Sequence, residues 1–165
     1  MTAGSPDRAP VLVLGLGNLL LADDAAGLRL LEQLAKESLD GGTADYVDGG
    51  TQGLALVGEL DGRGAVLILD AVGLGAAPGT VHVLRDEQIE GLRARRSSSA
   101  HEGNALELLE AARLIGCLPR HVVVVGIEPA AVHTGIGLSP AVDAAIPTAL
   151  AAARKILESL QDVID

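Results

Sequence analysis

Three short apolar runs constrain the fold of this chain more than any other feature of its sequence. They are VLVL at 11–14, AVLIL at 65–69 and VVVVGI at 122–127. Such runs are typical of strands whose two faces are both buried. Helical patterns of apolar residues lie between the runs, over 24–38 and 105–115. Strands that alternate with helices predict an α/β domain: a mostly parallel, twisted sheet with helices on both faces.

The remaining segments complete this domain. A short strand is expected at 44–47 and a helical segment at 51–60, and the alternation over 80–84 is typical of an edge strand, which we expect to be antiparallel. Ser139, followed by a proline, has the features of an N-cap and begins the last helix. Pro147 falls inside that helix, where we expect a kink or a break.

The length of 165 residues, without repeats or a long linker, predicts one domain over 10–165 after a loose tail at 1–9. Hydrophobic residues make up 48% of the chain, but Phe and Trp are absent, so Leu, Val, Ile and Ala must build the core. Cys117 is the single cysteine, which excludes an internal disulfide and a multi-cysteine zinc site and is expected for a cytoplasmic protein.

The charge balance argues against two classes of partner. Twelve basic and 22 acidic residues give a net charge of −10, which disfavours nucleic acids and anionic membranes. No segment approaches the roughly 20 apolar residues of a membrane-spanning helix.

The stretch GLGNLLLADDAAG at 15–27 follows the first apolar run and begins a helix. A dinucleotide-binding loop would lie at this place, but Leu20 stands where its third glycine is required, and Asp48 is the best remaining support for that alternative. In a sheet of order 2-1-3, ligands bind beyond the carboxyl ends of the first and third strands. Asp24 and Asp70 should meet there.

His101, at the start of a later helix, is a plausible third ligand. Two carboxylates and one imidazole suit a borderline divalent metal such as nickel or zinc better than calcium. Simpler interpretations remain open: Asp23 or Asp24 can favour the N-terminus of its own helix, Asp70 can form a turn, and His101 can be an ordinary exposed histidine. The remaining histidines are expected to be structural or solvated: His82, His121 and His133.

Six segments in order carry a resemblance to a known family. They are VLVLGLGNLLLADDAAGLRLLEQL, VDGGT, LILDAV, SSSAHEGNALELL, VVVVGIEP and GLSPAV. From Pro10 to Leu160 the chain resembles the [NiFe]-hydrogenase maturation endopeptidases. The resemblance implies a cytoplasmic protease that removes a C-terminal extension from the hydrogenase large-subunit precursor after nickel insertion. It also implies that the nickel comes with the substrate and that no organic cofactor is needed.

The family's metal-contacting positions, which we also expect to be catalytic, fall on Asp24, Asp70 and His101. Ala22 and Ala25 stand where many members carry glycine. The family's glycine turn matches Asp48, Gly49, Gly50 and Thr51, whose backbone is expected to contact an extended substrate tail. Two other functions remain open: a nucleotide-binding module and a non-catalytic chaperone of the large subunit. The serines at 97–99 are expected to form a flexible entry and not to supply a nucleophile.

Overall fold

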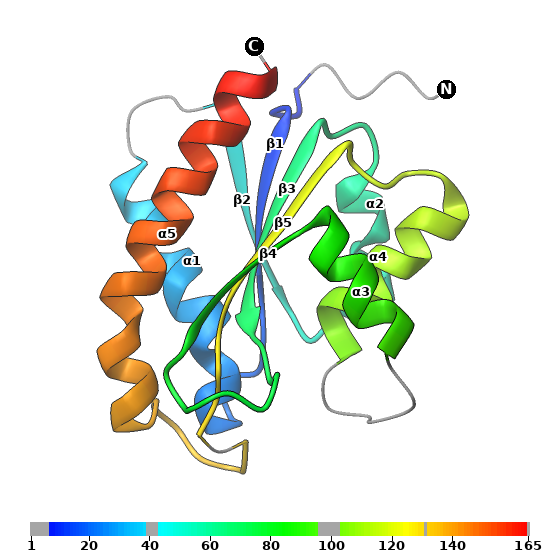
Figure 1. Cartoon of the computed structure of the whole chain (residues 1–165). Coiled ribbons are helices and arrows are strands. Elements are labelled where there is room, and N and C mark those ends of the chain that lie inside the picture. Colours follow the sequence, from blue (N-terminus) through cyan, green and yellow to red (C-terminus); the bar gives the residue numbers. More distant parts are fainter. Residues whose placement is uncertain (1–6, 39–42, 96–102, 131, 165) are drawn as a thin grey trace.

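The computed structural model describes residues 7–38, 43–95, 103–130 and 132–164. Its centre is a five-stranded sheet of order β2-β1-β3-β5-β4 (Figure 1). The four parallel strands are β1 (Val11–Leu16), β2 (Ala44–Gly50), β3 (Ala65–Ala71) and β5 (His121–Ile127). The edge strand β4 (Val81–Arg85) pairs antiparallel with β5. The predicted fold class, the 2-1-3 order and the antiparallel edge strand are confirmed.

Helices cover both faces of this sheet. Figure 1 shows α1 (Ala26–Glu37) and α5 (Pro140–Ile164) on one side, and α2 (Val57–Leu60), α3 (Asp86–Arg95) and α4 (Gly103–Ile115) on the other. Two 3-10 turns, η1 (Ala22–Ala25) and η2 (Gly53–Leu56), precede α1 and α2. The sequence patterns did not predict α3, whose single buried apolar residue among those described is Ile89.

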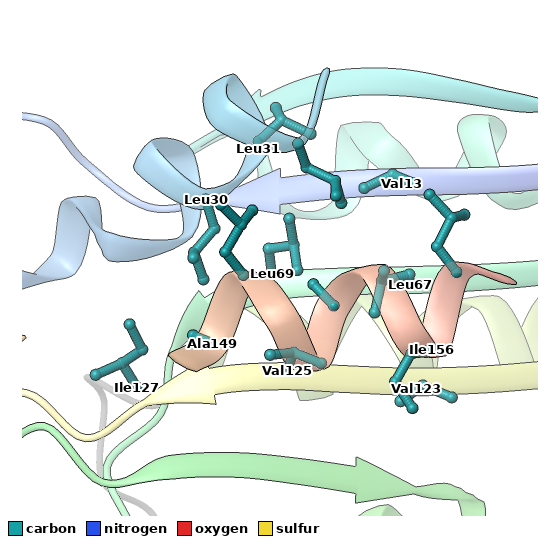
Figure 2. Packing of buried hydrophobic residues seen from close by; sticks show 14 of the residues in the cluster. Val13, Leu30, Leu31, Leu67, Leu69, Val123, Val125, Ile127, Ala149 and Ile156 are labelled. Carbon is teal, nitrogen blue, oxygen red and sulfur yellow. The ribbon is translucent and has the colours of Figure 1, made fainter. Parts of the chain in front are cut away.

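Alternate residues of the central strands pack into two separate cores. Val13, Leu67 and Val125 belong to the core that includes residues of α1 and α5, and Figure 2 shows them in one cluster with Leu30 and Ile156. Their neighbours along the strands pack on the opposite face against α2, α3 and α4; these neighbours include Leu12, Leu14, Val66, Ile68, Val122 and Val124. Each strand thus contributes to both cores, which explains why the three runs are apolar at almost every position.

The last helix differs from its prediction in one respect. The buried side of α5 consists of the apolar residues that its sequence pattern predicts, from Val142 to Leu160. Pro147 lies inside α5 and does not break it. Both Pro147 and Asp143, whose carbonyl loses a helical hydrogen bond to the proline, are exposed, so water can replace that bond. The expected break was therefore wrong, while a kink at Pro147 stays a prediction.

Gly27 determines where the first helix lies on the sheet. A Cβ atom at this position would lie 2.2 Å from the carbonyl oxygen of Leu69 and 2.7 Å from Cα of Asp70. Only a residue without a side chain allows α1 to begin this close to the carboxyl end of β3. This contact brings η1, and with it Asp24, to the end of the strand that carries Asp70.

The chain leading into β1 is held to the domain by hydrogen bonds. The backbone N–H of Ala9 donates to Oδ2 of Asp45 over 3.1 Å, and the guanidinium of Arg8 donates to the carbonyl of Gly58 over 2.8 Å. Residues 1–6 of the predicted tail lie outside the described residues. In the part of the chain that the structure describes, no helix is long and apolar enough to cross a bilayer.

Candidate active site

Asp24 and Asp70 line one cavity at the carboxyl edge of the sheet. The cavity has a volume of about 290 Å³ and lies beside the end of β3, with walls from α3, α4 and the segments that follow β3 and β5. Its other described lining residues are uncharged and mostly apolar: Ala71, Val72, Gly73, Leu74, Leu84, Ile89, Leu92, Ala105, Leu106, Val124, Pro129 and Val132. The two predicted carboxylates are thus brought together in an apolar setting.

The surroundings of Asp70 favour its neutral form. Its side chain belongs to a residue that is only 8% exposed, and the one hydrogen bond described for it comes from the backbone N–H of Ala71, over 2.8 Å. Burial, followed by the negative charge of Asp24, raises the pKa of Asp70 to about 7. Asp70 therefore exchanges a proton near neutral pH, as acid–base groups and metal ligands at functional sites commonly do.

Asp24 lies closer to solvent than Asp70. It is half-buried, and its Oδ2 accepts a hydrogen bond of 2.8 Å from the backbone N–H of Asn18. Burial raises the pKa of Asp24 as well, although the hydrogen bond from Asn18 opposes the shift. Two carboxylates that are both poorly solvated can bind a cation or hold a shared proton.

The neighbouring Asp23 has a different role from the one its position suggests. It is fully buried and accepts hydrogen bonds from the backbone N–H of Ala130, over 2.9 Å, and from the N–H and hydroxyl of Ser139, over 2.7 and 2.8 Å. Its position suggests that Asp23 favours the N-terminus of its own helix, but these partners lie in the loop between β5 and α5. Asp23 therefore fixes η1 in place, and Asp24 with it.

The third predicted ligand, His101, lies outside the described residues, as do the serines at 97–99. Among the described residues, no three His, Cys, Asp or Glu side chains form a group that could hold a metal ion. Within this part of the chain, the candidate site consists of the two aspartates.

The predicted substrate-contacting turn lies at the carboxyl end of β2, outside the cavity lining. Gly49 is buried, and a Cβ there would lie 2.7 Å from Cδ1 of Leu56. The N–H of Gly50 donates to Oδ1 of Asp48, and its carbonyl accepts from the N–H of Gly17, both over 3.0 Å. Thr51 is exposed. Packing and turn geometry account for the glycines, and contact with a substrate stays a prediction.

The sequence patterns did not single out one acid–imidazole pair, in which Glu128 is buried and His82 is partly buried. Glu128, which directly follows β5, accepts hydrogen bonds from the N–H groups of Leu74 and Gly75 over 2.8 and 2.9 Å. Nε2 of His82 lies 2.8 Å from Oε2 of this carboxylate, the oxygen that also accepts the hydrogen bond from Leu74. The pair holds the loop between β3 and β4, which lines the cavity through Leu74. The signal was present in the sequence, because Glu128 follows an apolar strand just as Asp70 ends one.

Together, the fold and the site define a class: an α/β protein whose ligand crevice carries one buried and one half-buried carboxylate in place of a phosphate-binding loop. Comparison with known proteins narrows this class. Residues 28–156 match the family model described as hydrogenase maturation protease. The chain is 37% identical over 153 residues to the hydrogenase 2 maturation protease of Escherichia coli K12, covering 92% of this chain and 91% of that protein.

Solved structures agree with the sequence matches. The hydrogenase maturating endopeptidase HybD from E. coli superposes with a TM-score of 0.80 at 36% identity, covering 90% of this chain and 92% of that one. The [NiFe] hydrogenase maturation protease HybD from Thermococcus kodakarensis gives a TM-score of 0.72 at 27% identity, covering 89% and 98%. The chain belongs to the hydrogenase maturation protease family. It is an enzyme that hydrolyses peptide bonds, and membership of the family implies a hydrogenase precursor as its substrate.

Proposed function

We propose that this protease removes the C-terminal extension of a [NiFe]-hydrogenase large-subunit precursor after nickel has been inserted. In this proposal, Asp24, Asp70 and His101 contact the nickel that the precursor carries. The observation that supports it best is the convergence of Asp24 and Asp70 in one largely apolar cavity. Carboxylates are costly to bury without a counter-charge, and an incoming cation would supply that charge.

The donor chemistry fits this substrate. Among the described lining residues of the cavity there is no Lys, Arg or His that could neutralise the two aspartates. His101 precedes α4 by two residues in the sequence, and Ala105 and Leu106 of α4 line the cavity. Two carboxylates and an imidazole form a mixed oxygen and nitrogen set of the kind that nickel accepts. We propose no organic cofactor.

The proton on Asp70 couples metal contact to pH. A carboxyl group must lose its proton before it can bind a metal ion. Because the pKa of Asp70 is raised to about 7, contact with nickel releases this proton in neutral or acidic solution. The proposal therefore includes a site that recognises nickel more strongly as the pH rises through neutrality.

The path of the substrate tail is proposed from the sheet topology. Strand β2 lies at one end of the strand order, so one of its sides pairs with no strand of the sheet. Extended peptides commonly bind at such free edges. We propose that the precursor tail contacts the turn Asp48, Gly49, Gly50 and Thr51 at the end of β2. The reaction is proposed to occur in the cytoplasm, without nucleic acid or membrane as a partner.

A processing assay tests this function. Purified protease, stripped of metal by a chelator, is mixed with nickel-loaded or nickel-free precursor, and the mass of the large subunit is measured. We expect shortening of the nickel-loaded precursor alone. The variants Asp24→Asn, Asp70→Asn and His101→Ala should leave it intact. Asp143→Asn, an exposed residue of α5, serves as the matched control and should process normally.

Three results would contradict parts of the proposal. Cleavage of the nickel-free precursor at the rate of the loaded one would exclude nickel recognition. Binding of the precursor without any cleavage would favour the chaperone alternative. A strict requirement for metal bound to the protease beforehand would indicate ordinary metal-assisted hydrolysis instead.

A further inference from the structure

Three loops at the carboxyl edge of the sheet present large apolar side chains to solvent. Leu19 and Leu20, between β1 and η1, are 52% and 61% exposed, and Ile136, between β5 and α5, is 84% exposed. Leu74 and Val132, in the segments after β3 and β5, are also exposed and line the cavity that holds Asp24 and Asp70. We call these five residues the apolar rim.

The two loops that carry the outer part of the rim are bonded to each other. The N–H of Ala22 donates to the carbonyl of Gly135 over 2.8 Å, and the N–H of Gly135 donates to the carbonyl of Leu20 over 2.9 Å. These bonds form an isolated parallel bridge between Leu21 and Gly135. Leu20 and Ile136 are therefore next to the residues that join the two loops.

The rim is also connected to the candidate active site. The side chain of Asn18 accepts a hydrogen bond from the N–H of Leu20 over 2.9 Å, while the N–H of Asn18 donates to Asp24. Asn18 therefore links the backbone of Leu20 to the carboxylate of Asp24. Because Leu74 and Val132 belong to the cavity wall, the rim continues the surface of the site outward.

The absence of charged residues from the rim indicates what kind of protein surface can bind to it. The chain carries a net charge of −10, yet residues 17–22 and 132–138 contain no Asp, Glu, Lys or Arg. An uncharged apolar surface of this kind, next to the cavity that holds Asp24 and Asp70, is typical of a protein-binding site. Its complement is an apolar, uncharged protein surface, because burying charged groups against it would cost free energy.

We infer that the apolar rim docks the folded body of the large-subunit precursor, at an apolar surface next to the segment that is cleaved. This inference rests on the proposed function, because it assumes that the precursor is the molecule that enters the cavity. The cavity would then recognise the metal and the scissile segment, while the rim recognises the fold that presents them. A second copy of this chain is the competing occupant.

The test compares two double variants, each of which removes two large apolar side chains that are more than half exposed. Leu20→Ser with Ile136→Ser removes the outer rim. Leu114→Ser with Ile115→Ser removes two residues that are 79% and 70% exposed at the end of α4, which precedes the amino end of β5. Thermal unfolding first establishes that both variants are folded. The Kd for the precursor, the KM and kcat of its cleavage and the sedimentation of the free protease are then measured.

We expect the rim variant to raise Kd and KM for the whole precursor by about tenfold or more, with kcat little changed. The α4 variant should bind like the wild type. Cleavage of a short synthetic peptide, if the wild type cleaves it, should be insensitive to both variants. Unchanged Kd and KM in the rim variant would overturn the inference. So would a wild-type dimer that the rim substitutions dissociate while precursor affinity stays the same.

The binding measurement separates this inference from the proposed function. If the wild type binds the precursor without cleaving it, and the rim variant loses that binding, the docking surface stands although the proposed reaction fails. If the wild type cleaves the precursor and the rim variant does so with the same KM, the function stands and the docking surface is wrong. If the wild type neither binds nor cleaves the precursor, both are wrong.

Discussion

The carboxylate of Asp23 accepts hydrogen bonds from both the backbone N–H and the hydroxyl of Ser139. This contact joins η1 to the beginning of α5, across most of the length of the chain. The two adjacent aspartates, Asp23 and Asp24, therefore have different roles. Asp23 holds the loop together, and Asp24 is turned toward the cavity.

The first prediction concerns this division of roles. Asp23→Ala should lower the free energy of unfolding by about 3 kcal/mol, because it removes a buried carboxylate that accepts hydrogen bonds from Ala130 and Ser139. Asp24→Ala should change stability little and abolish processing. Chemical denaturation and the precursor assay, run on both variants, measure the two effects. A fully stable Asp23→Ala protein would show that these hydrogen bonds contribute little.

A second prediction follows from the raised pKa of Asp70. The folded protein holds this proton up to about pH 7, whereas an unfolded aspartate releases it near its usual pKa of about 3.9. Between these values the folded state binds more protons, so its stability falls as the pH rises. The raised pKa of Asp70 therefore contributes to the free energy of unfolding. This contribution is fully present below about pH 4, is lost above about pH 7 and amounts to at most about 4 kcal/mol.

Asp70→Asn removes this dependence. The Tm of the variant relative to the wild type should therefore be higher at about pH 8 than at about pH 5, with both proteins free of metal. The asparagine oxygen can still accept the hydrogen bond from the N–H of Ala71. The comparison therefore measures the effect of the Asp70 charge on stability, without the loss of this hydrogen bond. An identical Tm difference at both pH values would contradict the pKa shift.

The third prediction concerns metal binding by the free protease. Nickel should raise the Tm of the wild type, because a ligand that binds only the folded state stabilises it. The increase should be greater above about pH 7, where Asp70 is deprotonated, than at about pH 5. Asp24→Asn and Asp70→Asn should each abolish the effect. A nickel-dependent increase that persists in both variants would place the metal elsewhere.

The fourth prediction tests how Gly27 positions the site. Gly27→Ala should lower the free energy of unfolding by more than about 2 kcal/mol and weaken processing, although alanine is the better helix former by about 1 kcal/mol. The added Cβ would lie 2.2 Å from the carbonyl oxygen of Leu69, so α1 must move away from β3.

Gly58→Ala in α2 is the matched control for this substitution. A Cβ at Gly58 meets no atom within 4 Å, so the variant should be neutral or slightly more stable. Comparison of the two melting curves separates the close approach at Gly27 from the general effect of replacing a helical glycine. Equal stability of the two variants would show that α1 tolerates the shift.

Local patterns of residues were sufficient to predict the layers of this protein. The apolar runs at 11–14, 65–69 and 122–127 indicated strands buried on both faces, because only a sheet covered by helices leaves no face in water. The same patterns placed Asp24 and Asp70 after neighbouring strands, and parallel strands end at the same edge of a sheet. These inferences depend on periodicity and on the ends of elements, which a single sequence contains.

Contacts between distant segments were decided by the tertiary structure alone. Nothing near Asp23 in the sequence identifies Ser139 as its partner, and nothing near His82 identifies Glu128. The buried state of Asp70, and therefore its raised pKa, depends on walls that α3, α4 and the loop after β5 supply. Hydrogen bonding and desolvation depend on distances in space, and the sequence determines these distances only through the folded chain.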